Sequence, residues 1–182
     1  MLLARVEPAT VHGCLSISDQ ELGEHYLSAQ SFFGPDVYAV HGLLGREVVG
    51  FALGQIFDHH QFIHHHAMIM KHFPAHLMLT HGNIGVFSAM AVRKAYQRQG
   101  IGSLLAQCLL GHFDAGMVPL VIIAGWAAPD GVHIDRLAHE FGFSGQAMIH
   151  DYWLEDSVAR GYQCPVCGDP PCRCSAVLYV RQ

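Results

Sequence analysis

One stretch of this sequence indicates the fold: Ala91-Val92-Arg93-Lys94-Ala95-Tyr96-Gln97-Arg98-Gln99-Gly100-Ile101-Gly102. It joins an apolar, strand-like segment (86–92) to a segment whose apolar residues have helical spacing (102–113). Glycines in this loop let the backbone approach a ligand closely, because they have no Cβ atom. The unpaired amide groups at the helix start carry the positive end of the helix dipole. The stretch therefore predicts a phosphate-binding loop, to which Arg98 can add a positive charge.

Other phosphate-binding loops fit less well, although a plain helix start after a flexible lead would look similar. A Walker A loop is excluded because no Gly-Lys-Ser/Thr sequence follows. A dinucleotide-binding fingerprint fits poorly because Leu105 occupies its third glycine position.

The pattern Gln97-x-x-Gly100-x-Gly102 resembles the pyrophosphate-binding motif of the GNAT superfamily of N-acetyltransferases, Gln/Arg-x-x-Gly-x-Gly/Ala. Tyr96 before the motif and Phe141-Gly142-Phe143 after the next helix are similar to the same family. The resemblance spans roughly residues 35–182. It implies a mixed α/β (α+β) sheet that is splayed around acetyl-CoA, and direct acetyl transfer from the thioester to an amine.

The resemblance also implies the cofactor contacts. The backbone around Met90 would bind the pantetheine arm, the loop would hold the pyrophosphate, and Ser103 would lie at the helix start. The expected cofactor-binding residues are Met90, Ala91, Val92, Gln97, Arg98, Gln99, Gly100, Ile101, Gly102 and Ser103.

The usual proton-handling residues of the family are missing. Ala138 replaces the tyrosine that many members place four positions before the helix-closing glycine, and Gly125-Trp126 stands near the place of a common asparagine. A histidine suits proton transfer because it ionises at about pH 6.5. The remaining candidates are His81 and Ser88 near the cofactor strand, and Asp135 and His139 on the later helix. Transfer through a water molecule, or a CoA-binding protein without activity, also fits.

Four of the six cysteines lie in one short segment with Cys-x2-Cys-x4-Cys-x-Cys spacing. A Cys-x2-Cys-Gly turn brings two thiolates together, and two more would complete a tetrahedral zinc site with no open position. We therefore expect structural zinc held by a knuckle at 164–174; disulfides, free thiols and a redox role are the alternatives. In this family the connection between the last two strands can border the acceptor site. The expected ligands are Cys164, Cys167, Cys172 and Cys174.

Residues 58–83 are rich in histidine and methionine. The pairs His60/His64 and His72/His76 have the i,i+4 spacing that would allow metal binding on a helix. The favoured interpretation is an apolar insertion between two strands, which could form a lid over the acceptor pocket or the surface of a homodimer.

Composition limits the remaining classes. A chain of 182 residues, 51% hydrophobic and 14% charged, predicts one globular domain over 1–182. A net charge of −5 with scattered basic residues argues against nucleic-acid binding. No apolar run is long enough to span a membrane, and the start does not resemble a signal peptide, so we expect a cytoplasmic protein.

Local patterns predict a helix within 16–33 capped by Ser18 or Asp19, and a hairpin of strands 37–41 and 48–57. They also predict partial helix over 64–79, strands at 119–126, 147–154 and 176–180, and a helix at 132–141.

The sequence thus predicts an acetyl-CoA-dependent N-acetyltransferase for a small-molecule or amino-acid-like amine. The negative charge favours a cationic acceptor such as a polyamine, an aminoglycoside or lysine. A non-catalytic CoA-binding regulatory protein and a zinc-dependent protein-interaction module are the alternatives.

Overall fold

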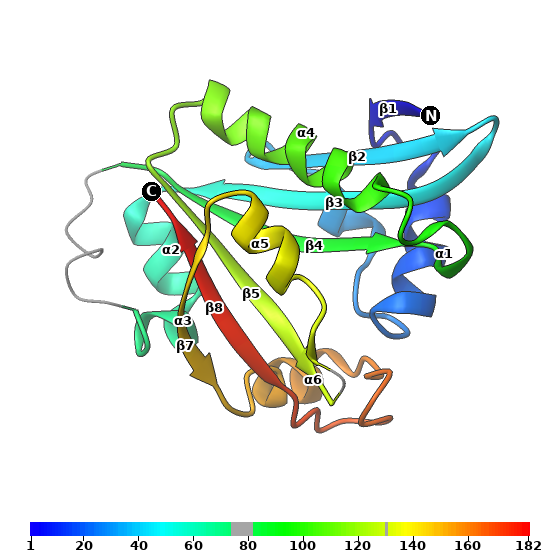
Figure 1. Ribbon diagram of the computed structural model, residues 1–182. Coiled ribbons are helices and arrows are strands. Elements are labelled where there is room, and N and C mark those ends of the chain that lie inside the picture. Colours follow the sequence, from blue (N-terminus) through cyan, green and yellow to red (C-terminus); the bar gives the residue numbers. More distant parts are fainter. Residues whose placement is uncertain (74–81, 130) are drawn as a thin grey trace.

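The computed structural model describes residues 1–73, 82–129 and 131–182. These residues form a mixed sheet with the strand order β1-β2-β3-β4-β5-β8-β7, and the short β6 pairs with β5 (Figure 1). The strands are β1 (Leu2–Arg5), β2 (Val37–Leu44), β3 (Glu47–Phe57), β4 (Ile84–Val92), β5 (Leu120–Ala128), β6 (Gly131–Val132), β7 (Ser144–Ile149) and β8 (Ser175–Arg181). The mixed α/β fold and the predicted hairpin, now β2 and β3, are confirmed.

Helices cover both faces of the sheet (Figure 1). Successive side chains of β5 point to opposite faces of the sheet. Val121 and Ile123 pack with α4 on one face, and Leu120 and Ile122 pack with α2 and α3 on the other. Helix α1 packs on the α2 side of the sheet, against β3 and β4. The helices are α1 (Val11–Glu21), α2 (His59–His65), α3 (Ala67–Met70), α4 (Ile101–Ala115), α5 (Asp135–Glu140) and α6 (Leu154–Arg160).

The central strands β4 and β5 separate halfway along their length. Their parallel ladder joins 84–87 to 120–123 and ends there, and beyond it the two strands diverge (Figure 1). The β3–β4 register skips Ser88, so a bulge lies at the point of divergence. In a regular strand, residues two positions apart face the same side of the sheet. The bulge breaks this rule in β4, because Phe87 packs in the α4 layer and Ala89 packs in the α1 layer. Among the described strands, one edge of β4 over 88–92 therefore has no partner.

Helix α4 packs close to the sheet because a glycine of β3, Gly54, faces it. Its buried residues, from Ile101 to Phe113, recur every three or four positions. A Cβ atom on Gly54 of β3 would lie 2.7 Å from the Phe113 ring and 2.9 Å from Leu109. The side chains of α4 occupy this space, which sets the distance between the helix and β3.

Two predicted elements need correction. Helix α1 begins after Thr10, not at Ser18 or Asp19, because its apolar face starts at Val11; the carbonyl of Ser18 already accepts from Leu22 in the last turn. The strand expected at 147–154 is β7, which runs from 144 to 149, and it is followed by the unpredicted α6.

The boundaries of two other helices also differ from the prediction. Helix α5 spans only 135–140, because the residues from 131 to 132 pair with β5 instead. The helix expected at 64–79 is replaced at its start by two short helices: α2 begins earlier, at His59, and α3 covers Ala67–Met70. Residues 74–81 lie outside the described residues. Among the residues described, no helix is both long and apolar enough to cross a lipid bilayer.

Candidate functional site

The loop before α4 has the backbone geometry of an anion site. Gly100 adopts φ 80° and caps the helix without a side chain, and Arg98 has φ 64°, also in the left-handed region. Such residues turn successive amide groups toward one concave side. The first-turn amides of a 15-residue helix point to the same place. Gly102 and Ser103 stand half-buried in that first turn.

The loop is braced from behind by α1 and β3. The Gln97 side-chain amide donates to the carbonyl of Val92 at 2.8 Å and to the carboxylate of Glu21 at 3.0 Å. The Tyr96 hydroxyl donates to Glu47 at 2.8 Å. Gln97, expected to contact cofactor, is thus occupied within the protein, and it holds the loop against the end of β4.

The unpaired edge of β4 leads from this loop to a pocket between the diverging strands. Of the residues expected along the pantetheine arm, Ala91 is buried against the α1 layer, while Met90 lines the pocket. Two other residues expected to bind the cofactor have different positions. Ile101 is buried in the core, so only its backbone can face a ligand, whereas the side chain of Gln99 is exposed.

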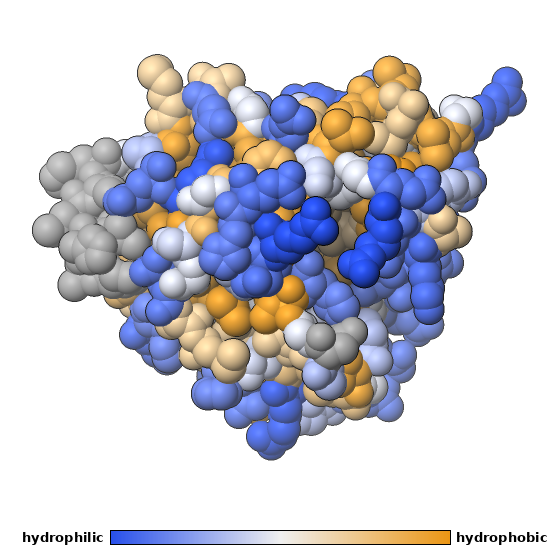
Figure 2. Space-filling view, viewed as in Figure 1, coloured by the Kyte–Doolittle hydropathy of each residue, from blue (hydrophilic) through white to orange (hydrophobic). Residues whose placement is uncertain are grey.

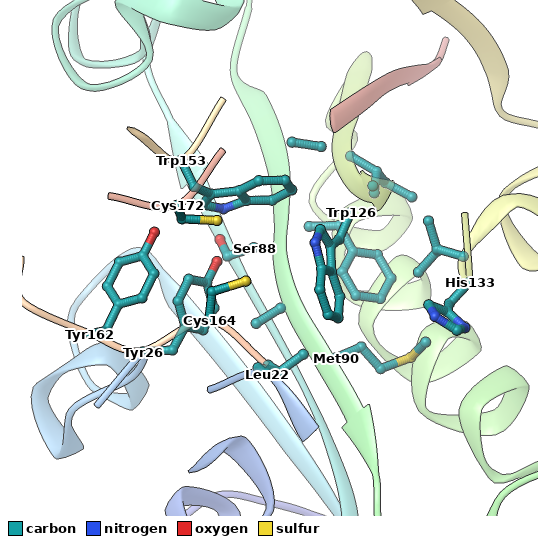
Figure 3. A pocket seen from close by; sticks show the side chains of 16 residues that line it. Leu22, Tyr26, Ser88, Met90, Trp126, His133, Trp153, Tyr162, Cys164 and Cys172 are labelled. Carbon is teal, nitrogen blue, oxygen red and sulfur yellow. The ribbon is translucent and has the colours of Figure 1, made fainter. Parts of the chain in front are cut away.

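The pocket has a volume of about 200 Å³ and mainly apolar walls. Figure 3 shows Tyr26, Tyr162 and two cysteines on one side, with Trp126 and His133 on the other. The complete lining is Leu22, Tyr26, Phe87, Ser88, Ala89, Met90, Ile123, Ala124, Gly125, Trp126, His133, Ile134, Trp153, Tyr162, Cys164 and Cys172.

A second, more polar cavity of about 540 Å³ lies beyond Tyr26 and Ser88, which line both spaces. Its other walls come from the segment after α1, from β2 and β3, and from α6. They are His25, Leu27, Ser28, Ser31, Val37, Leu53, Gln55 and Arg160.

The predicted catalytic candidates have different positions. Ser88, at the bulge, lines the pocket, and its hydroxyl donates to the carbonyl of Val86 over a long 3.4 Å. His81 lies outside the described residues. Asp135 and His139 pair with each other at 3.4 Å on α5 and do not line the pocket. The outer side of α5 that carries them is hydrophilic (Figure 2).

The place of the missing family tyrosine lies in the core. Ala138 of α5 is fully buried in the apolar cluster beneath α4, and it does not line the pocket. Tyr179 of β8 packs in the same apolar cluster, and its hydroxyl donates to Asp135 at 2.6 Å.

Sequence reasoning missed the aromatic side of the pocket. Tyr26 and Tyr162 meet edge to face at 5.1 Å, and the guanidinium of Arg160 lies 5.6 and 5.1 Å from their ring centres. Burial raises the pKa of both tyrosines, so both hydroxyls are protonated at neutral pH. These residues are far apart in the chain and no motif links them, so no sequence signal could have found them.

The four cysteines of the knuckle converge as expected. All six cysteines are free thiols, and the sulfur atoms of Cys164, Cys167, Cys172 and Cys174 lie within 4.8 Å of one another. The sulfur of Cys174 is 3.7 Å from that of Cys164 and 3.5 Å from that of Cys167. Tetrahedral zinc with Zn–S bonds of about 2.3 Å requires sulfur–sulfur distances of about 3.8 Å. The arrangement fits a four-sulfur metal site.

The local backbone explains this convergence. Cys164 and Gly168 exchange two amide–carbonyl bonds of 2.8 Å, which close the Cys-x2-Cys-Gly turn, and Gly168 adopts φ 79°. The amide of Cys172 donates to the Ser157 hydroxyl at 2.8 Å, so α6 anchors the second half. Trp126 and Trp153 pack against the buried thiols.

Comparison with known proteins identifies the family of this chain. Residues 11–143 match the model of the acetyltransferase (GNAT) family. This match starts at α1, earlier than the resemblance seen in the sequence, and it ends before the cysteine segment. No curated protein matches the sequence.

Similar solved structures extend over nearly the whole chain. The ribosomal-protein-S18-alanine N-acetyltransferase from Escherichia coli has a TM-score of 0.66 at 15% identity, covering 98% of this chain and 91% of that one. Arabidopsis thaliana NAA60 in complex with acetyl-CoA has a TM-score of 0.70 at 15% identity, and the match covers 99% of this chain and 97% of that one. An agmatine N-acetyltransferase mutant has a TM-score of 0.66 at 12% identity, and the match covers 99% of this chain and 98% of that one. At these identities the likeness establishes the fold alone.

Proposed function

Because this chain belongs to the GNAT family of acetyltransferases, we propose that it transfers the acetyl group of acetyl-CoA directly to an amine of a small-molecule or amino-acid-like acceptor. One observation carries the proposal. The braced anion loop, the unpaired edge of β4 and the pocket beyond the bulge follow one another along a single strand. That order suits a long cofactor with a phosphate at one end and a thioester at the other.

In this proposal, acetyl-CoA binds through the residues expected from the family motif. The backbone of Met90, Ala91 and Val92 pairs with the pantetheine arm, and the amides of loop 97–102 and of Ser103 hold the pyrophosphate. Arg98, exposed beside the loop, contributes charge. The complex of NAA60 with acetyl-CoA supports the choice of cofactor.

The acceptor amine reaches the thioester from the aromatic side. The apolar walls disfavour a charged ammonium, which promotes loss of its proton before attack. Nitrogen then forms a bond to the carbonyl carbon, the carbon–sulfur bond breaks, and the thiolate of CoA takes up a proton. Ser88 is the described candidate for relaying the amine proton, directly or through a water molecule; His81 stays a prediction.

Two cavities that share Tyr26 and Ser88 in their walls suggest the kind of acceptor. The inner pocket, with its apolar and aromatic walls, suits an alkyl amine that has lost its proton, together with the adjacent carbon atoms. The outer cavity, with serine, glutamine and histidine side chains, suits the polar remainder of an amino-acid-like molecule. Solved structures with a similar fold are named for a protein acceptor, ribosomal protein S18, and for a small one, agmatine.

We further propose that the knuckle holds structural zinc through Cys164, Cys167, Cys172 and Cys174. Four sulfur ligands leave no position for substrate, so the metal would not take part in the chemistry. Elemental analysis of the purified protein tests this, and fewer than about half an equivalent of zinc would contradict it. A homodimer through the His/Met-rich segment stays a prediction that a mass measurement in solution tests.

The decisive experiment measures CoA release with a thiol reagent across a panel of polyamines, aminoglycosides and amino acids. We expect acceptor-dependent release from at least one class. Ser88→Ala should lower kcat by about tenfold or more, while Ser144→Ala, on edge strand β7 outside the pocket, should not. CoA binding without release for any amine would favour the regulatory alternative. Absence of CoA binding would contradict both.

A further inference from the structure

The cysteine centre forms part of the wall of the acceptor pocket. Cys164 and Cys172 line it directly, and the other wall residues that pack on the centre are Trp126 and Trp153 (Figure 3). The metal ligands and the proposed acetyl-transfer site therefore share side chains.

Trp126 connects the centre to the splayed strands. It lies on β5 beyond the end of the β4–β5 ladder, where its partner is Ala176 of β8. Its indole packs against the buried thiols of the cysteine centre. A metal ion that holds the four sulfur atoms together would thus also fix the surface on which the ring of Trp126 packs.

The centre also holds the opposite wall. The amide of Gln163, next to the first ligand, donates to the carbonyl of Glu24 at 3.0 Å. The backbones meet so closely that a Cβ atom on Gly23 would lie 1.9 Å from the Gln163 carbonyl oxygen. Tyr26 follows directly and contacts Tyr162, so both aromatic rings of that wall depend on the same segment.

Among the described residues, the cofactor loop has no direct hydrogen bond to the cysteine segment. Loop 97–102 is braced by Glu21 and by Glu47, through the bonds to Gln97 and Tyr96. Losing the metal should therefore loosen the acceptor side and leave the CoA side intact.

We propose that the metal bound by the four cysteines positions Trp126 and the Tyr26–Tyr162 wall, and so sets the width of the acceptor pocket. This inference rests on the proposed zinc site and on the proposed function. It gives the metal a positioning role in acceptor binding, distinct from a general contribution to stability.

The chain offers a direct reporter, because its only two tryptophans are Trp126 and Trp153. In a Trp153→Phe variant, fluorescence comes from Trp126 alone. The test measures acrylamide quenching of Trp126 before chelation, after chelation, and after Zn²⁺ is returned. CoA affinity is measured by calorimetry in the same three states.

We expect chelation to raise the quenching constant by about twofold or more, and Zn²⁺ to restore it. The CoA dissociation constant should stay within about twofold. Cys167→Ser should reproduce the chelated state, because Cys167 is exposed and its loss leaves no core cavity. Cys108→Ser, a cysteine outside the cluster, should behave as the unsubstituted protein.

Three results would overturn the inference. One is unchanged quenching after the metal has gone. Another is parallel loss of CoA affinity, which would show a global structural role. The third is a protein that binds no zinc. None of these readouts needs turnover, so failure to find an acceptor would count against the proposed function alone. With an active amine, the acceptor KM should rise by about fivefold or more after chelation, at a CoA KM that is little changed.

Discussion

The glycines at 100 and 102 offer a matched pair of substitutions in the anion loop. Gly100 has φ 80° and ψ 0°, and a Cβ atom placed on it would meet nothing within 4 Å. Alanine there is therefore penalised by its backbone conformation and not by a clash. A Cβ on Gly102 would have Met90 as its nearest neighbour at 3.8 Å, an ordinary contact.

The magnitudes follow from these conformations. A left-handed alanine costs about 1–2 kcal/mol. We expect the loop of Gly100→Ala to relax without ligand and to regain the strained geometry when CoA binds. The dissociation constant should then rise roughly 5- to 30-fold, since about 1.4 kcal/mol corresponds to tenfold. Gly102→Ala gains helix propensity of up to about 1 kcal/mol and should keep its affinity within about threefold.

Calorimetric titration of both variants with CoA, beside thermal unfolding, separates binding from stability. Gly100→Ala should lower Tm by no more than a few degrees, because 1 kcal/mol shifts a domain of this size by about 2–4 °C. Equal affinity in Gly100→Ala and the unsubstituted protein would refute the reasoning. So would a larger loss in Gly102→Ala than in Gly100→Ala.

Other predictions concern packing, pH and charge. Gly54→Ala should lower the free energy of unfolding in urea by about 1–3 kcal/mol, because its Cβ would meet the Phe113 ring at 2.7 Å; Gly111→Ala, with open space around it on α4, should not. Burial, followed by the charge of a neighbouring histidine, lowers the pKa of His66 to about 4 from 6.5. Its contribution to stability is thus present above pH 6.5 and lost as pH falls toward 4, and His66→Phe should flatten that decline in denaturation series. Arg98→Gln should weaken CoA binding a few-fold and reduce its salt dependence in calorimetry; an unchanged salt dependence would argue against a charge contact.

The sequence alone determined the features that depend on neighbouring residues. The strand, loop and helix around Gly100 were predictable, because a left-handed glycine, the free amides of a helix start and the 3.6-residue spacing of α4 are local properties. The convergence of the cysteines was predictable for the same reason, since one short turn, closed by the bonds between Cys164 and Gly168, brings two thiols together. The family assignment followed from that local motif and is confirmed.

Two elements carried local signals that were missed. Helix α6 has Glu155 and Asp156 in its first turn and the left-handed Gly161 after its end, the usual marks of a short helix. Helix α1 was placed too late because acidic residues after Ser18 resembled a first turn, whereas the apolar face that packs on the sheet starts at Val11.

Only the tertiary structure decided the composition of the pocket. Tyr26 and Tyr162 follow α1 and α6, and Trp126 lies on β5; their meeting depends on the splay of β4 from β5 and on the backbone contact between Gly23 and Gln163. It likewise showed that Asp135 and His139 stand apart from the pocket and that Ser88 lies at the bulge. Contacts between residues so far apart in the chain leave no periodic or spacing signal, because they arise from the packing of whole elements, which no local pattern encodes.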